Sequence, residues 1–280
     1  MLVKTKFITF ISLGICAAAI LTSCTNNTPE INNHGETVSS ESNITVEPNK
    51  AHFIIKDKPA KNAVKTTYSK EGETLNSLEI EELSITPHER ADKDAAYNMK
   101  EIINVQGEKR LYSIYDSNNE VLLAEMTNEN FDASSLPHKI AVDYTCVRND
   151  GKAISVLETI NSYAADQLQT TVTTAYNFVP LTGERIIQVF YTPGNKEEYD
   201  AADNTMYEKL VSKYGAELIS YSSVSSSFVD VAAECWFFAE DGEGISVIFP
   251  AGRITPVEAG ALELEYSKEE LPEAAQKYFN

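Results

Sequence analysis

The side chains that could perform catalysis in this chain are its histidines and its clustered carboxylates. The histidines are His34, His52, His88 and His138. No two of them lie within a helical turn of each other, so the sequence has no HExxH-type metal motif. It also has no GxSxG nucleophile elbow, phosphate-binding loop or EF-hand pattern. We therefore expect a protein that is not an enzyme and needs no cofactor and no metal.

Three groups of acidic residues are the remaining candidates for chemistry. Glu81-Glu82 in an expected strand and Glu240, Asp241 and Glu243 at an expected turn could supply an acid/base pair, but solvated surface positions explain them better. A third group could hold calcium loosely, or could be acids placed favourably at a helix N-terminus: Glu197, Glu198, Asp200 and Asp203.

The N-terminus predicts where the protein resides. Lys4 and Lys6 precede an apolar stretch from Phe7 to Leu21, which is too short to span a bilayer as a permanent helix. Thr22, Ser23 and Cys24 follow, the small-residue-then-cysteine order of a lipoprotein signal. We expect residues 1–23 to be removed and Cys24 to be the site of lipid attachment, with more than one acyl chain, such as palmitate, for stable anchoring. This predicts a protein anchored on the outer face of a bacterial cell membrane.

The chain is strongly acidic. Its net charge is −19, and removal of residues 1–23 takes away two lysines and no acidic residue, which gives −21. Such a charge repels nucleic acid and anionic lipid headgroups and favours a basic protein or a cation as partner. Solubility of an exported protein explains the same charge. Residues 24–50 contain almost no large apolar side chain and are expected to be a disordered tether.

Periodicity beyond residue 50 predicts an α+β fold, with an antiparallel sheet built from hairpins and a few covering helices. We expect strands at His52–Ile55 and Ser77–Ile85, and a hairpin of Lys109–Tyr115 and Glu120–Met126 around Asp116–Asn119. Ala202–Leu218 has helical spacing. Ile154–Ala165 and Glu269–Phe279 are expected to be further helices or strand-to-helix transitions.

Two further hairpins are predicted at Asp150-Gly151 and Asp241-Gly242, each followed by Ile-Ser-Val. Cys146 lies four residues before Asp150, and Cys235 lies six residues before Asp241. Because both separations are even, the two side chains lie on corresponding faces of their strands if neither strand is bulged. They are the thiols that remain once Cys16 is removed and Cys24 acylated. Either they form a disulfide outside the cytosol, or they are two separate buried thiols.

Two other segments stand out by composition. Ser220–Ser227 is rich in Ser and Tyr and is either an adaptable binding surface or, more simply, an exposed edge strand. Trp236 lies beside Cys235 and Phe237-Phe238 and is expected in the core.

The second half of the chain resembles the DUF3298 family. The matching pieces begin with Asn149-Asp150-Gly151 and Ile154-Ser155-Val156. Further pieces are Tyr176-Asn177-Phe178, Thr182-Gly183, Trp236-Phe237-Phe238 and Ile254-x-Pro256-x-x-x-Gly260 ahead of Leu262–Tyr266. The chain departs from the family pattern at Gly252 and Val257, where aromatic residues are expected. Residues 138–280 are thus expected to be a DUF3298-like α+β domain, and residues 51–137 an N-terminal α+β region that resembles the DUF4163 module.

The resemblance implies a binding role. DUF3298 modules occur at the extracellular end of the lysozyme-sensing anti-sigma factor RsiV and beside the catalytic domain of some peptidoglycan deacetylases. We expect this chain neither to hold a sigma factor nor to deacetylate, but to bind a basic muramidase such as lysozyme, or peptidoglycan. An envelope enzyme acting on peptidoglycan and a small-ligand-binding lipoprotein are the alternatives.

The lipid anchor is testable in cells. Cys24→Ala should move the protein from the membrane pellet to the culture medium, because the acyl chains have no other attachment point. Immunoblots of the two fractions measure this, and retention of the variant in the pellet would contradict the anchor.

Overall fold

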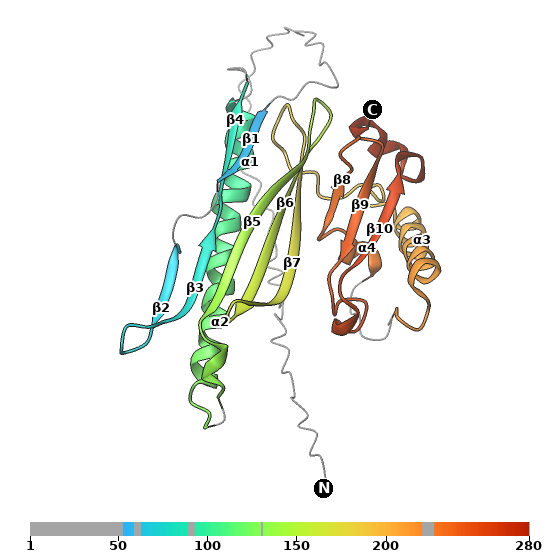
Figure 1. Cartoon of the computed structure of the whole chain (residues 1–280). Coiled ribbons are helices and arrows are strands. Elements are labelled where there is room, and N and C mark those ends of the chain that lie inside the picture. The colour runs from blue at the N-terminus through green and yellow to red at the C-terminus, as the bar shows by residue number, and fades with distance from the viewer. Residues whose placement is uncertain (1–52, 59–62, 89–92, 130, 220–226, 280) are drawn as a thin grey trace. The chain divides into compact units, whose positions relative to one another are not determined.

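The largest sheet in the structure has five strands, and helices lie against one of its faces (Figure 1). The computed structural model describes residues 53–58, 63–88, 93–129, 131–219 and 227–279. The strands are β1 Phe53–Lys58, β2 Lys65–Tyr68, β3 Thr74–Ile80, β4 Glu82–Pro87, β5 His138–Asn149, β6 Ile154–Ala164, β7 Gln167–Phe178, β8 Trp236–Phe238, β9 Gly244–Phe249 and β10 Leu262–Ser267. The α-helices are α1 Lys93–Lys100, α2 Glu108–Glu125, α3 Lys196–Tyr214 and α4 Phe228–Ala232. A π-helix, η2 Glu101–Gly107, joins α1 to α2, and the 3-10 turns are η3 Ala133–Ser135, η5 Val257–Ala259, η6 Lys268–Glu270 and η7 Glu273–Tyr278.

The strands form three sheets. The large sheet has the order β2-β3-β5-β6-β7, and all its pairs are antiparallel except β3 with β5. A second sheet has the order β10-β9-β8, and β1 pairs with β4. The predicted α+β class, with antiparallel hairpins and a few covering helices, is confirmed. None of the helices in the described ranges is both long and apolar enough to cross a bilayer.

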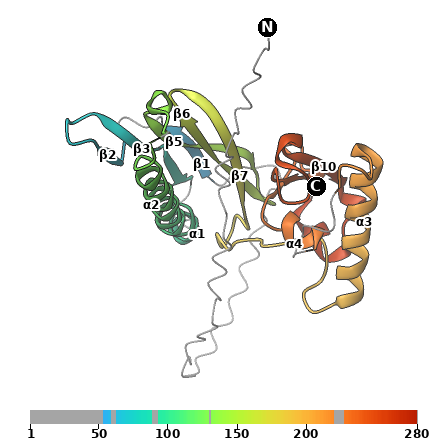
Figure 2. The ribbon, with the colours of Figure 1, turned by 90° about the horizontal axis from the view of Figure 1, so that it is seen from below.

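The helices α1, η2 and α2 follow one another without a break and cover one face of the large sheet (Figure 2). Even-numbered residues of β5 as far as Cys146, and residues of β6 and β7 such as Val156 and Tyr176, face them, because side chains alternate along a strand. Met99, Ile103 and Leu111 from the helices are fully buried against this face.

The hairpin predicted at Lys109–Met126 is wrong, because this stretch forms α2. Leu111, Tyr115 and Leu122 are buried at helical spacing. Asp116 and Ser117, which the sequence pattern places at a turn, lie on the exposed side of the helix. Burial of a helical stripe against the sheet therefore outweighs the local turn preference of Asp, Ser and Asn.

Other predicted elements had mixed outcomes. The helix at Ala202–Leu218 is confirmed as the body of α3, and the strand at His52–Ile55 corresponds to β1, although His52 itself lies outside the described residues. The single strand predicted at Ser77–Ile85 is divided between β3 and β4, which belong to different sheets. Ile154–Ala165 is a strand and not a helix, and Glu269–Phe279 consists of 3-10 turns.

The large sheet contains strands from both regions expected from sequence, residues 51–137 and residues 138–280. β3 lies before residue 137 and β5 after it, yet Asn76–Ile80 pairs in parallel with His138–Val142. The described residues all belong to one compact unit, Thr45–Asn280.

A buried carboxylate holds the helix layer to the sheet. Glu158 on β6 is fully buried and forms an ion pair with Arg110 of α2. The hydroxyls of Tyr144 and Tyr176 each donate to Glu158 Oε2 at 3.4 Å. Burial, followed by the Glu158 charge, raises the pKa of both tyrosines, so both remain hydrogen-bond donors at neutral pH.

Arg110→Met should destabilise the protein by about 3–5 kcal/mol, because it leaves the buried Glu158 carboxylate without its ion-pair partner. Chemical denaturation at pH 7 measures the loss.

Two variants control this experiment. Lys109→Met changes an exposed neighbour on the same helix and should cost under about 0.5 kcal/mol. Arg110→Met combined with Glu158→Gln should recover part of the loss, since no buried carboxylate then lacks its ion-pair partner. Equal stability of Arg110→Met and Lys109→Met would show that the ion pair is not needed.

Candidate functional site

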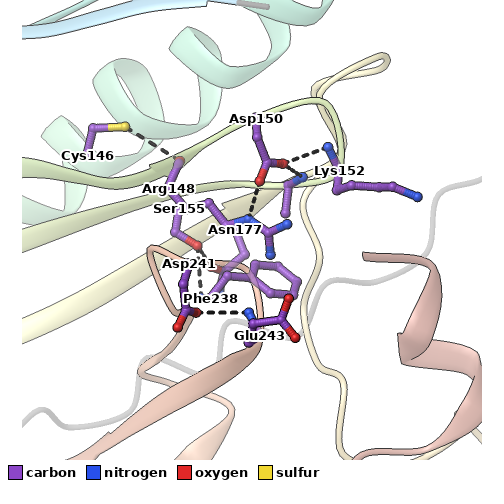
Figure 3. Close-up of polar contacts among 10 residues, drawn as sticks. Cys146, Arg148, Asp150, Lys152, Ser155, Asn177, Phe238, Asp241 and Glu243 are labelled. Carbon is purple, nitrogen blue, oxygen red and sulfur yellow. Dashed lines mark hydrogen bonds and ion pairs between the residues drawn. The ribbon is translucent and has the colours of Figure 1, made fainter. Parts of the chain in front are cut away.

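The two predicted Asp-Gly hairpins are confirmed, and they lie against each other (Figure 3). In the β5–β6 turn, Asp150 Oδ1 accepts hydrogen bonds from the Lys152 and Ala153 backbone N–H groups at 2.7 and 2.9 Å. In the β8–β9 turn, Asp241 Oδ1 accepts from the Glu243 N–H at 2.9 Å. Each aspartate thus fixes its own turn, as Asx turns do.

A chain of buried hydrogen bonds links the hairpins. The Ser155 hydroxyl donates to Asn177 Oδ1 at 2.6 Å and accepts from the Phe238 N–H at 3.1 Å. Asn177 Nδ2 donates to the Trp236 carbonyl at 2.6 Å. Three of the sequence pieces that carry the family resemblance therefore meet here, joining β6 and β7 of the large sheet to β8 of the small one.

The Thr182-Gly183 piece has a different role. Gly183 has φ +67°, and a Cβ atom there would lie 2.3 Å from the Ala95 carbonyl oxygen of α1. Asn98 Nδ2 donates to the Thr182 carbonyl at 2.8 Å. Glycine is required because the turn after β7 presses directly on a helix backbone.

A bulge in β5 changes which side chains face the second hairpin. Cys146 is paired with Val156 and Arg148 with Ser155, so one extra residue lies between them. Arg148 consequently shares a face with Ser155, where its guanidinium lies 5.2 Å from the centre of the Phe238 ring. Its Nε donates to Asp150 Oδ2 at 2.7 Å, while Nη1 and Nη2, both buried, have no hydrogen-bond partner within the described part of the chain.

The two cysteines lie in different sheets or beside them. Cys146 faces the helix side with Val156, whereas Cys235 directly precedes β8 of the small sheet. Both are free thiols in the structure. Burial raises the pKa of Cys146 to about 11 and that of Cys235 to about 12, which makes both poor nucleophiles at neutral pH.

A pocket of about 400 Å³ lies between α3 and the C-terminal turns. Its floor is apolar and its rim acidic. The lining residues are Phe190, Glu198, Ala201, Ala202, Thr205, Met206, Tyr266, Glu270, Leu271, Pro272 and Glu273.

The polar groups of this pocket differ in how well they are satisfied. Hydrogen bonds from the Thr192 N–H and from Asn195 lower the pKa of Glu198. Burial alone would raise the pKa of Glu270, but the Lys209 ammonium at 2.6 Å and the Ser267 N–H outweigh it and lower this pKa. Tyr266 is only 5% exposed, and its hydroxyl has no hydrogen-bond partner in the described ranges. Burial, then the Glu270 charge, raises its pKa, so it stays protonated.

The acids predicted around Glu197–Asp203 lie at the start of α3. Lys196 pairs with Asp200 at 2.8 Å, and Asp203 Oδ1 accepts from the Val229 N–H at 3.0 Å. Within the described ranges, no three His, Cys, Asp or Glu residues are grouped as metal ligands. Of this set, the structure brings only Glu198 into the pocket.

The other predicted positions are dispersed. Glu240, Asp241 and Glu243 are exposed, and Glu81 instead accepts a hydrogen bond from the Tyr144 N–H at 3.1 Å. Trp236 is confirmed as core, at 1% exposed. Cys24 and residues 220–226 of the Ser/Tyr-rich segment lie outside the described residues.

Sequence reasoning missed Tyr266, Glu270 and Glu273 as pocket residues. The alternating pattern of β10 does predict that Leu262, Leu264 and Tyr266 lie on its buried face. Nothing local in the sequence shows that they meet α3, because the two segments come together only through the fold of the intervening chain.

Comparison with known proteins identifies the fold. No protein-family model matches the sequence, and no curated protein matches it significantly. Among solved structures, a DUF3298 family member from Bacteroides fragilis NCTC 9343 superposes with a TM-score of 0.55 at 11% identity, covering 82% of this chain and 98% of that one. A DUF3298 family protein from Pseudomonas aeruginosa PAO1 gives 0.44 at 10% identity, covering 83% and 97%. The Bacteroides likeness shows that the chain has the fold of a DUF3298 family protein, in agreement with the resemblance of its motifs.

Asn177→Ala should lower the free energy of unfolding by about 2–4 kcal/mol, because it leaves the buried Ser155 O–H without an acceptor and the buried Trp236 carbonyl without a donor. Urea denaturation followed by the fluorescence of the single tryptophan measures it. Asn204→Ala, on the exposed side of α3, is the matched control and should change stability by under about 0.5 kcal/mol. A loss no larger than the control's would mean that the hydrogen-bond chain does not hold the two sheets together.

Proposed function

We propose that this protein is a non-catalytic lipoprotein of the cell envelope that binds a cationic cell-wall hydrolase of the lysozyme kind. The observation that carries the proposal is its charge, −19 for the whole chain and −21 without residues 1–23. Animal lysozymes are strongly basic, and opposite net charges raise both encounter rate and affinity.

The fold and the anchor support the same function. The chain has the fold of a DUF3298 family protein, and its motifs resemble the family whose modules sense lysozyme outside the cell. Attachment through Cys24 would hold the folded part on the outer face of the membrane, where such hydrolases arrive.

Charge alone would give weak binding to every basic protein. The pocket beside α3 adds shape, since it combines carboxylates at its rim with an apolar floor. A specific interface uses both kinds of contact, with an apolar centre and a polar edge.

Calorimetry with the full chain in mild detergent tests the proposal. At physiological ionic strength, exposed charges more than about 8 Å apart are largely screened. We expect binding of lysozyme to persist there, and to slow the hydrolase if its cleft is the surface contacted. Cytochrome c, a basic protein of another class, is the control. Equal affinity for both would refute the proposal, and binding of wall fragments in place of lysozyme would identify peptidoglycan as the partner.

A further inference from the structure

We propose that the open edge of β7 pairs with the same edge of a second copy of this chain, so that two large sheets join into one. This contact is separate from the proposed function, because it joins identical chains and needs no hydrolase. It follows from the direction of the β7 backbone groups, from the protection of other sheet edges and from the lack of charge on this strand.

β7 lies at the end of the large sheet's strand order, next to β6 (Figure 1). In an antiparallel strand, the N–H and C=O of one residue point to the same side, and successive residues alternate. The Asn177 carbonyl accepts from the Ile186 N–H at 2.7 Å, and the Ala175 carbonyl accepts from Arg185 Nη2 at 3.4 Å. Backbone groups of odd-numbered β7 residues therefore point away from β6.

Thr171 and Thr173 continue this series toward the start of the strand. In the described part of the chain, the backbone N–H and C=O groups of these two residues have no hydrogen-bond partner. Thr171 is exposed, and Leu168 nearby is 56% exposed. The first half of β7 thus presents unpaired backbone groups to solvent, which is the arrangement that another strand requires.

Other edges carry the features that normally prevent such pairing. At the opposite end of the large sheet, β2 has four residues, begins with Lys65 and is irregular between Thr67 and Tyr68. In the small sheet, the edge strand β8 has three residues. Short strands, lysines and bulges all disfavour the addition of a further strand.

The remaining edge of the small sheet, β10, is covered by α3. Lys213 Nζ and the Tyr214 hydroxyl each donate to the Glu263 carbonyl at 2.8 Å. Lys209 Nζ donates to the Glu265 carbonyl at 3.2 Å. Side chains of the helix therefore occupy the outward carbonyls of β10, whereas the corresponding groups in the first half of β7 remain open.

Two properties of β7 point to a second copy as its partner. The strand has twelve residues, Gln167–Phe178, and none of them is charged, proline or glycine, although the chain has a net charge of −19. A basic protein would find no carboxylate along it. An identical antiparallel strand places no like charges opposite each other, and it aligns Thr171 of one copy with Thr173 of the other, a favourable cross-strand pair. The edge is therefore complementary to itself, as a twofold interface must be.

The pairing is weak and reversible. Thr171 and Thr173 of the two copies would exchange roughly four backbone hydrogen bonds across the twofold axis. Such a contact is smaller than a standard interface of roughly 1,200–2,000 Å². Two acidic chains also repel each other, and salt screens this repulsion. Self-association should therefore strengthen as ionic strength rises, the opposite of the salt dependence for binding a basic partner.

Sedimentation equilibrium of the full chain in density-matched detergent measures the dimer at low and at physiological salt. Thr173→Pro removes an N–H that points away from β6, a change that an edge strand tolerates. We expect it to weaken dimerisation at least about tenfold and to leave the far-UV circular dichroism unchanged. Thr173→Val keeps the N–H and the side-chain shape, so this matched control should dimerise within about twofold of wild type.

Two double variants test the alignment of the strands. Thr171→Lys with Thr173→Lys places lysines opposite lysines and should weaken the dimer at least about tenfold, although it makes the chain less acidic and so reduces the overall repulsion. Thr171→Glu with Thr173→Lys places opposite charges across the axis and should dimerise at least as well as wild type. This pair of variants decides the matter if Thr173→Pro fails to fold.

The outcomes are distinct. A chain that stays monomeric at every concentration and at both salt concentrations would overturn the proposal. So would a dimer that the double-lysine variant leaves intact, because its interface would then lie elsewhere. Loss of the dimer in the double-lysine variant, with retention in the glutamate–lysine variant, supports antiparallel pairing of β7 with its copy. Neither result depends on whether the protein binds a hydrolase.

Discussion

The hydrogen bonds from Ser155 and Asn177 to β8 are the interaction on which the arrangement of the second half depends. Apolar packing can hold two sheets together, but it does not fix their register, because dispersion and burial are not directional. Asn177 bonds the Trp236 carbonyl and Ser155 the Phe238 N–H, so β8 can take only one position on the large sheet. The Trp236 ring then packs edge-on against Phe190 at 6.1 Å, and Phe190 against Tyr266 at 6.2 Å. A polar contact at the sheet junction thereby positions the floor of a pocket on the far side of the small sheet.

The bulge in β5 is the second constraint, and it shows how much one residue can change. Alternation along an unbulged strand would place Cys146 and Arg148 on the same face. The extra residue leaves the thiol on the helix side and turns the guanidinium toward Phe238. The even separations of the two cysteines from their turns place them on corresponding faces only if neither strand has a bulge. The residues next to Cys146 include no glycine, so the sequence gives no sign of the bulge.

Local signals predicted local structure well. The Asp150 and Asp241 turns were predictable because each aspartate bonds backbone groups two or three residues ahead. The segment around Asp116 has the same kind of residues, yet it is helical, because Leu111 and Tyr115 gain more by burial on the sheet than the turn would gain. The division of Ser77–Ile85 between two sheets was equally hidden, since both strands alternate in the same way and only their partners differ. The pocket could not be predicted at all, because its residues come from segments between Phe190 and Glu273 that share no motif.

Charge and pocket act at different ranges, and the difference matters for specificity. A net charge of −19 attracts any basic protein and is screened within about 8 Å at physiological salt. It also keeps the chain soluble, so it does not by itself require a partner. Solubility does not account for a concave site with a floor of Phe190 and Met206 and a buried Tyr266 hydroxyl that lacks a partner. Long-range attraction by the net charge does not depend on a partner's shape, whereas the apolar floor can stabilise only a group that enters the pocket.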